Sequence, residues 1–163
     1  MTPDTILLAI SILIYGLGEI GKNTCKNVLE YTSNDNITLV NRTLEKAVNF
    51  EQEHNTVSVV DFTNLTEEIH KTDILIVSTG ANTPTVTEAH LKAGKELLII
   101  DLSMPENVDV SVKSLKGITL INVLSDDLAS RHPRQYMIPT YSLLSQSSRS
   151  WLNVLFQFSS LGV

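Results

Sequence analysis

Short apolar runs of strand length recur along the chain. They are rich in Ile, Leu and Val and do not alternate with polar residues, which is typical of strands buried on both faces of a parallel sheet. The runs are Ser11–Tyr15, Ile37–Val40, Val57–Val60, Ile74–Val77, Leu97–Ile100 and Ile118–Ile121. Together they predict the strands of one open sheet.

Segments with helical features lie between these runs. The predicted helices are Gly18–Glu30, Thr43–His54, Thr63–Lys71 and Pro84–Lys92. The Thr43 hydroxyl is placed to cap the second helix, and Gly94 suits a left-handed position after the fourth. Regular alternation of strand and helix favours right-handed crossovers. The predicted fold is therefore α/β, a doubly wound, mostly parallel sheet of the Rossmann type in three α/β/α layers.

The end of the chain departs from this pattern. We predict that residues 1–139 form the domain, and that residues 140–163 are a separate segment, rich in serine and then apolar. Trp151, Leu155 and Phe158 have helical spacing in this tail. A packed helix, a truncated connection to another domain and a segment foreign to the protein all fit the tail.

Composition places the chain among ordinary globular proteins. Its 163 residues are 42% hydrophobic and 18% charged, enough for one domain with a proper core. Cys25 is the only cysteine, which excludes an internal disulfide framework and makes the cytoplasm the default location. The apolar run Ile6–Tyr15 is too short to span a bilayer, so no membrane partner is expected. The net charge of −6 without a basic cluster argues against a strong grip on nucleic-acid phosphates.

A glycine-rich motif directly follows the first apolar run. It reads Gly16, Leu17, Gly18, Glu19, Ile20 and Gly21. In a strand–loop–helix context, G-x-G-x-x-G is typical of dinucleotide-binding domains. Gly16 permits the tight turn, Gly18 lets the backbone approach a pyrophosphate, and Gly21 lets the helix pack closely on the sheet. The alternative is a close turn that binds nothing.

The end of the second predicted strand indicates which dinucleotide is preferred. NAD-binding domains usually carry Asp or Glu there, about twenty residues after the glycines, whereas this chain reads Asn41, Arg42 and Thr43. Arg42 can pair with a 2′-phosphate and stack on the adenine, and Asn41, Thr43 and Lys46 can add donors. This pattern favours NADP(H), although an ordinary solvated arginine is the alternative.

Two further segments fall at the same edge of the predicted sheet. Ser78, Thr79 and Gly80 follow the fourth strand, where their hydroxyls could reach a ribose beside the nicotinamide, or where they could form an ordinary polar turn. Asp101 ends the fifth strand. It is a candidate cofactor-binding carboxylate, but without a visible partner a cap for the turn before Pro105 is the favoured interpretation.

The sequence offers little other chemistry. Its four histidines are scattered, and Cys25 is not spaced with any of them as a metal ligand would be, so we expect no metal. Cys25 is better explained as a small buried side chain than as a nucleophile. The chain thus has candidates for holding a hydride donor but none for activating a substrate.

Several motifs taken together resemble one family. They are Ile14–Gly21, Val40–Ala47, Ile76–Ala81, Ile99–Pro105 and Asp126–Leu128. In combination they resemble the central NADPH-binding domain of glutamyl-tRNA reductase, over about Ser11 to Arg131. The residues after Pro139 do not match the long polar helix of that family.

The resemblance implies a function for the whole protein. Glutamyl-tRNA reductases form a thioester between a cysteine of an N-terminal catalytic domain and the glutamyl group of glutamyl-tRNA. Hydride from NADPH then yields glutamate-1-semialdehyde for tetrapyrrole (porphyrin and haem) biosynthesis. The implied partners are the enzyme's other domains, glutamyl-tRNA bound through the catalytic domain, and a second copy in a homodimer. No catalytic residue is expected in this chain, so we expect a fragment that is inactive alone.

Two other readings stay open. A shikimate-dehydrogenase-like oxidoreductase shares the Asn-Arg-Thr motif, but it needs a substrate domain with catalytic Lys and Asp. A non-catalytic NADP-binding module, with the apolar tail as its partner surface, is the other.

Overall fold

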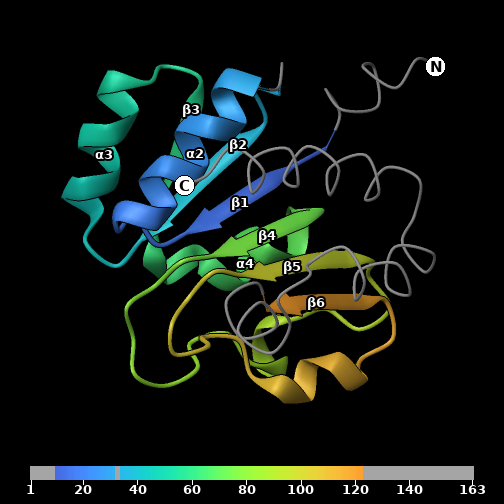
Figure 1. The fold of residues 1–163 in the computed structure, drawn as a ribbon. Helices are drawn as coiled ribbons and strands as arrows, with labels where there is room; N and C mark the ends of the chain where they lie inside the picture. The colour runs from blue at the N-terminus through green and yellow to red at the C-terminus, as the bar shows by residue number, and fades with distance from the viewer. Residues whose placement is uncertain (1–9, 32–33, 123–163) are drawn as a thin grey trace.

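The computed structural model describes residues 10–31 and 34–122. Six parallel strands form one sheet in the order β3-β2-β1-β4-β5-β6 (Figure 1). The strands are β1 (Ile12–Tyr15), β2 (Ile37–Asn41), β3 (Val57–Asp61), β4 (Ile74–Val77), β5 (Leu97–Asp101) and β6 (Ile118–Asn122). Each predicted strand boundary lies within one residue of the observed one. The doubly wound Rossmann order confirms the predicted fold class.

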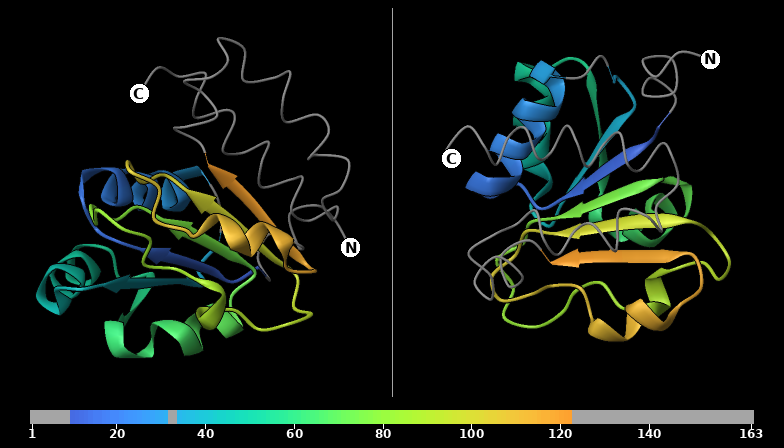
Figure 2. Two further views of the ribbon diagram at one scale, coloured as in Figure 1. Left: turned by 90° about the horizontal axis from the view of Figure 1, so that it is seen from below. Right: turned by 45° about the vertical axis from the view of Figure 1, so that its right-hand side comes forward.

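Helices cover both faces of the sheet (Figure 2). Two long helices pack on one face, α2 (Glu19–Tyr31) and α3 (Leu44–Glu53). The other face carries α4 (Leu65–Lys71) with the short 3₁₀ turns η1 (Phe62–Asn64), η2 (Glu88–His90) and η3 (Val110–Ser114). These layers confirm the predicted three-layer arrangement.

The central strand β1 supplies side chains to both halves of the core. Ile12 and Ile14 pack in the cluster beneath α2 and α3, whereas Leu13 and Tyr15 point into the cluster beneath α4. All four are buried. Burying one such aliphatic side chain contributes about 1.5–3 kcal/mol, which explains why apolar runs without alternation occupy the centre of the sheet.

The predicted helix Pro84–Lys92 is wrong. The N–H groups of Thr85 and Val86 donate to the Asn107 carbonyl at 2.8 and 3.0 Å, and Val86 forms a parallel bridge with Val108. This segment is therefore extended, and only η2 follows it. Threonine and valine resist helix formation because their β-branched side chains are stiff. The loop that follows β5 supplies the backbone hydrogen-bond partners for an extended conformation instead. Gly94 has a positive φ of 77° as expected, but it closes a turn.

Two predicted helix starts also differ in detail. Thr43 occupies the N-cap position of α3, yet its side chain makes no capping hydrogen bond. The third predicted helix divides into η1 and α4. Asp61 caps η1 by accepting from the N–H and hydroxyl of Thr63 at 2.9 and 2.6 Å. These hydrogen bonds hold the pKa of the Asp61 carboxyl below its usual value.

Some predictions lie outside the described residues. They concern the domain boundary at residue 139, the tail at 140–163 and the motif Asp126–Leu128. In the described part of the chain, no helix is long and apolar enough to cross a membrane.

The buried thiol of Cys25 provides a test of the core. The side chain is fully buried on α2, and burial raises the pKa of the thiol from 9.0 to about 12. Because the thiolate is the reactive form, we expect iodoacetamide at pH 8 to leave the native protein unmodified and to label it once in denaturant. Mass spectrometry measures this directly, and rapid labelling of native protein would contradict the packing described.

The same group predicts a pH dependence of stability. The folded-state pKa lies above the unfolded value, so the folded protein retains a proton that the unfolded chain loses between pH 9 and about 12. The stabilising contribution is present below pH 9 and declines as the pH rises through that window. Urea unfolding of the native chain and of Cys25→Ala should therefore show a steeper alkaline loss of stability in the native chain.

Candidate functional site

The predicted site residues gather at one edge of the sheet. The chain runs outward from β1 to β3, then returns to β4 on the other side of β1. Ligands of open α/β sheets bind outside the carboxyl ends of the strands at such a switch point. The loops that follow β1, β2, β4 and β5 all emerge at this edge, on the left of Figure 1.

Two of the three loop glycines are required by close backbone contacts within the protein. Gly16 has a φ of +101°, and a Cβ there would lie 2.4 Å from the Ser78 carbonyl oxygen. A Cβ on Gly21 would lie 2.0 Å from the Gly16 carbonyl oxygen. No other residue fits either position without displacing backbone. These contacts match the turn and packing roles predicted from the motif.

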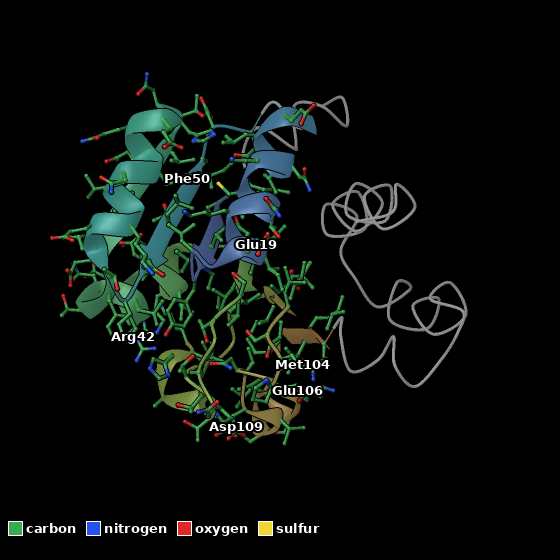
Figure 3. The ribbon with its side chains drawn as sticks, turned by 60° about the vertical axis from the view of Figure 1, so that its left-hand side comes forward. Glu19, Arg42, Phe50, Met104, Glu106 and Asp109 are labelled. Carbon is green, nitrogen blue, oxygen red and sulfur yellow. The ribbon has the colours of Figure 1, made fainter. Side chains whose placement is uncertain are left out.

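Gly18 differs from its two neighbours in the motif. It is exposed, and a Cβ there would have no protein atom within 4 Å. Glu19 (Figure 3) and Ile20, which begin α2, are also exposed, whereas Leu17 is buried. The missing side chain at Gly18 therefore leaves space on the solvent side of the loop, where the backbone remains accessible.

Asn41 joins the glycine loop to the loop that follows β2. Its Oδ1 accepts from the Leu17 N–H at 3.0 Å, and its Nδ2 donates to the Thr43 carbonyl at 2.8 Å. The sequence pattern predicts this side chain to be an added donor for the cofactor. The structure instead gives it a structural bond on each side, a role that the sequence carries no local signal for.

Arg42 follows Asn41, and its side chain is exposed to solvent (Figure 3). Within residues 10–31 and 34–122, no protein group forms a hydrogen bond or ion pair with its guanidinium. Thr43 and Lys46 are exposed on the same loop and the first turn of α3. Three potential donors thus face solvent together next to the glycine loop.

The segment after β4 is held mainly by protein contacts. The Ser78 hydroxyl donates to the Gly16 carbonyl at 2.8 Å and is buried, and the Thr79 hydroxyl donates to Asn107 Oδ1. Both hydroxyls that were candidates for a ribose contact therefore have protein partners, which favours the turn interpretation for these two side chains. Gly80 is exposed, with open space where a Cβ would be.

Asp101 acts as a turn cap. One carboxylate oxygen accepts from the Ser103 N–H at 2.9 Å, and the other accepts from the N–H groups of Asn107 and Val108 at 2.7 and 2.8 Å. The side chain is 1% exposed. This is the cap that sequence analysis favoured over a cofactor contact, with its partners extending further along the loop than expected.

Within the described ranges, no three His, Cys, Asp or Glu side chains are grouped as metal ligands would be. The arrangement is therefore one of backbone, small residues and cations at the end of a parallel sheet. Its chemistry is suited to holding a phosphorylated ligand.

A protein-family model described as shikimate / quinate 5-dehydrogenase matches residues 6–130. The chain belongs to this family.

Curated relatives of this family member carry another name. The glutamyl-tRNA reductase 2 of Flavobacterium johnsoniae is 40% identical over 148 residues, which cover 88% of this chain and 33% of the relative. The glutamyl-tRNA reductase of Christiangramia forsetii is 45% identical over 113 residues, 69% of this chain and 27% of the relative. The predicted resemblance to glutamyl-tRNA reductase is thereby confirmed. The chain spans a third or less of the length of these two relatives.

Solved structures agree on the fold of this shikimate / quinate 5-dehydrogenase family member. The glutamyl-tRNA reductase of Methanopyrus kandleri superposes with a TM-score of 0.65 at 21% identity, over 95% of this chain and 40% of that one. The nucleotide binding domain of the Thermoplasma volcanium reductase gives 0.55 at 19% identity, over 86% of this chain and 97% of that one.

The contrast between Gly16 and Gly18 generates a prediction for this family member. Gly16→Ala combines a left-handed backbone with a clash against the Ser78 carbonyl, so we expect a loss of about 2–4 kcal/mol or more in the free energy of unfolding. Gly18→Ala, which meets open space, is the matched control and should change stability by about 1 kcal/mol or less. Urea denaturation measures both. Equal losses would contradict the loop geometry.

Proposed function

We propose that the chain is the NADP(H)-binding domain of a glutamyl-tRNA reductase. The observation that carries this proposal is the exposed Arg42 guanidinium at the end of β2, which has no protein partner within the described residues. An NAD-binding domain usually has a carboxylate at this position. An acidic residue there would repel a 2′-phosphate, whereas Arg42 offers a planar, permanently charged fork of donors. The names of the curated relatives support the choice of enzyme.

The residues at this edge fit the cofactor. The N–H groups at the start of α2 would hold the pyrophosphate, because Gly18 leaves the loop backbone open to it. Arg42 would bind the 2′-phosphate and stack on the adenine, with Thr43 and Lys46 as further donors. Asn41 would keep the glycine loop and the Arg42 loop in register through its bonds to Leu17 and Thr43.

In the whole enzyme this domain would serve a catalytic domain elsewhere in the protein. When bound, NADPH supplies the hydride that reduces a cysteine-bound glutamyl thioester to glutamate-1-semialdehyde. Cys25 is not suited to be that cysteine, because it is fully buried and its thiol pKa is raised to about 12. The partners we infer are the enzyme's remaining domains, glutamyl-tRNA, and a second copy of the enzyme in a homodimer in the cytoplasm.

A second candidate is a shikimate-dehydrogenase-like oxidoreductase. The family model that matches residues 6–130 favours it, since that model bears this name. The relatives at 38–45% identity named glutamyl-tRNA reductase weigh against it. Both candidates use the same cofactor edge, so the assignment of NADP(H) does not depend on the choice between them.

Titration with NADPH and NADH tests the proposal. Because a hydrogen bond to a charged group contributes about 1.5–3 kcal/mol, Arg42→Ala should weaken NADPH binding roughly ten- to a hundredfold. NADH binding should hardly change, because NADH has no 2′-phosphate. Isothermal titration calorimetry gives both dissociation constants.

The control for charge alone is Lys113→Ala. Lys113 is an exposed cation on η3, which packs against β6, on the opposite side of the sheet from β2. It should leave both affinities unchanged. If the native chain prefers NADH, or if Arg42→Ala weakens the two nucleotides equally, the assignment of the 2′-phosphate to Arg42 fails.

A further inference from the structure

A single buried side chain connects the loops that follow β4 and β5. Asn107 is 0% exposed, although it lies in a loop and carries a polar amide. In Figure 1 these two loops run close together at the carboxyl edge of the sheet. A fully buried amide in a loop requires partners for all of its polar atoms, because each unpaired group costs about 1–3 kcal/mol.

Both ends of the Asn107 amide are engaged. Its Oδ1 accepts from the hydroxyls of Thr79 and Thr85. Its Nδ2 donates to the Ala81 carbonyl at 2.9 Å and to the Pro105 carbonyl at 3.0 Å. The side chain thus fixes both the side chain and the backbone of the segment 79–81.

A second contact between the two loops reinforces the first. The Thr79 N–H donates to the Ser103 hydroxyl at 3.1 Å, and Ser103 is itself placed by Asp101 through its N–H. We call Thr79, Ser103 and Asn107 the loop clamp. Met104 and Glu106, labelled in Figure 3, mark the course of the β5 loop that carries two of its members.

The outer part of the two loops is held together without the clamp. Thr85 and Val86 donate their N–H groups to the Asn107 carbonyl, and Asp109 donates to the Val86 carbonyl. Backbone pairing therefore joins the loops at that end, where the Thr85 hydroxyl adds one side-chain bond to Asn107 Oδ1. The clamp adds its bonds at the other end, on the residues that directly follow β4 and that contact the glycine loop through Ser78 and Gly16.

We propose that Asn107 is a positioning residue, which holds the backbone of residues 79–81 as a fixed surface for the nicotinamide–ribose half of the cofactor. The proposal rests on the proposed function, because it deepens the assignment of this edge to NADP(H). Gly80, exposed and with open space above it, is the part of that surface that a ligand could approach. The geometry assigns Arg42 and the clamp to opposite halves of one ligand, since β2 and β4 flank β1.

The test compares NADPH with adenosine 2′,5′-bisphosphate, which has the 2′-phosphate but no nicotinamide. Asn107→Ala would leave several buried groups unpaired and is expected to fold poorly, so Thr79→Val and Ser103→Ala carry the test. Each removes one bond between the loops at residue 79. We expect each to weaken NADPH binding about three- to tenfold, the range for one lost neutral hydrogen bond. Binding of the bisphosphate should change less than about twofold.

Thr85→Val is the matched control. It removes a hydroxyl from the same Asn107 oxygen, at the outer end of the loops. If these hydroxyls had a purely structural role, Thr85→Val would change the ratio of the NADPH and bisphosphate affinities as much as Thr79→Val does. We expect Thr85→Val to leave that ratio at the native value. Thr79→Ser, which keeps the hydroxyl, should restore that ratio.

Two results would overturn the proposal. One is an equal change, or no change, in both ligands for Thr79→Val and Ser103→Ala. The other is an effect of Thr79→Val alone, which would indicate a direct contact between Thr79 and the ligand. Failure of the NADP(H) assignment has a different signature, because the native chain would then bind neither ligand or would prefer NADH.

Discussion

The close approach of the glycine loop to the end of β4 is the constraint on which this edge of the protein depends. Gly16 lies against the Ser78 carbonyl, Ser78 bonds back to the Gly16 carbonyl, and Gly21 brings α2 against the same atom. A side chain at Gly16 would clash with the segment after β4, and one at Gly21 would push α2 away from the glycine loop. With this contact in place, the start of α2 and the segment after β4 lie side by side, because they follow the neighbouring strands β1 and β4. This is the point where the strand order reverses.

Most polar side chains at the edge are engaged in building these loops. Asn41, Ser78, Thr79 and Asp101 all bond within the protein, because polar groups that are buried by close-packed loops must find partners there. What is left for a ligand is the accessible backbone at Gly18 and Gly80 and the exposed donors headed by Arg42. A site of this kind recognises its ligand by shape and phosphate charge, with few dedicated side chains.

The sequence predicts the features that are local and leaves out those that depend on distant partners. Strand boundaries followed from apolar runs, and the roles of Gly16 and Gly21 followed from a six-residue motif in its strand–helix context. The helix predicted at Pro84–Lys92 was wrong because Val86 pairs with Val108, which no local pattern indicates. Asn107 gave no signal as a site residue, since its partners Thr79 and Ala81 are more than twenty residues away in the chain. For the same reason the hydroxyls of Ser78 and Thr79 could not be divided between ribose and protein from sequence alone.

The two halves of the edge would contribute differently to catalysis. A 2′-phosphate is the same in the oxidised and reduced cofactor and does not change during hydride transfer. Arg42 would therefore lower the free energy of the bound ground state and the transition state equally, which sets the selectivity for NADP(H) but not the rate of the chemical step. The nicotinamide is the part that reacts, and small displacements of a reacting group are costly in rate. A surface exposed at Gly80 but anchored by a fully buried amide meets that requirement, because the anchor is removed from solvent while the backbone it holds stays accessible. Selectivity can thus reside in a solvated arginine, whereas positioning needs a buried network.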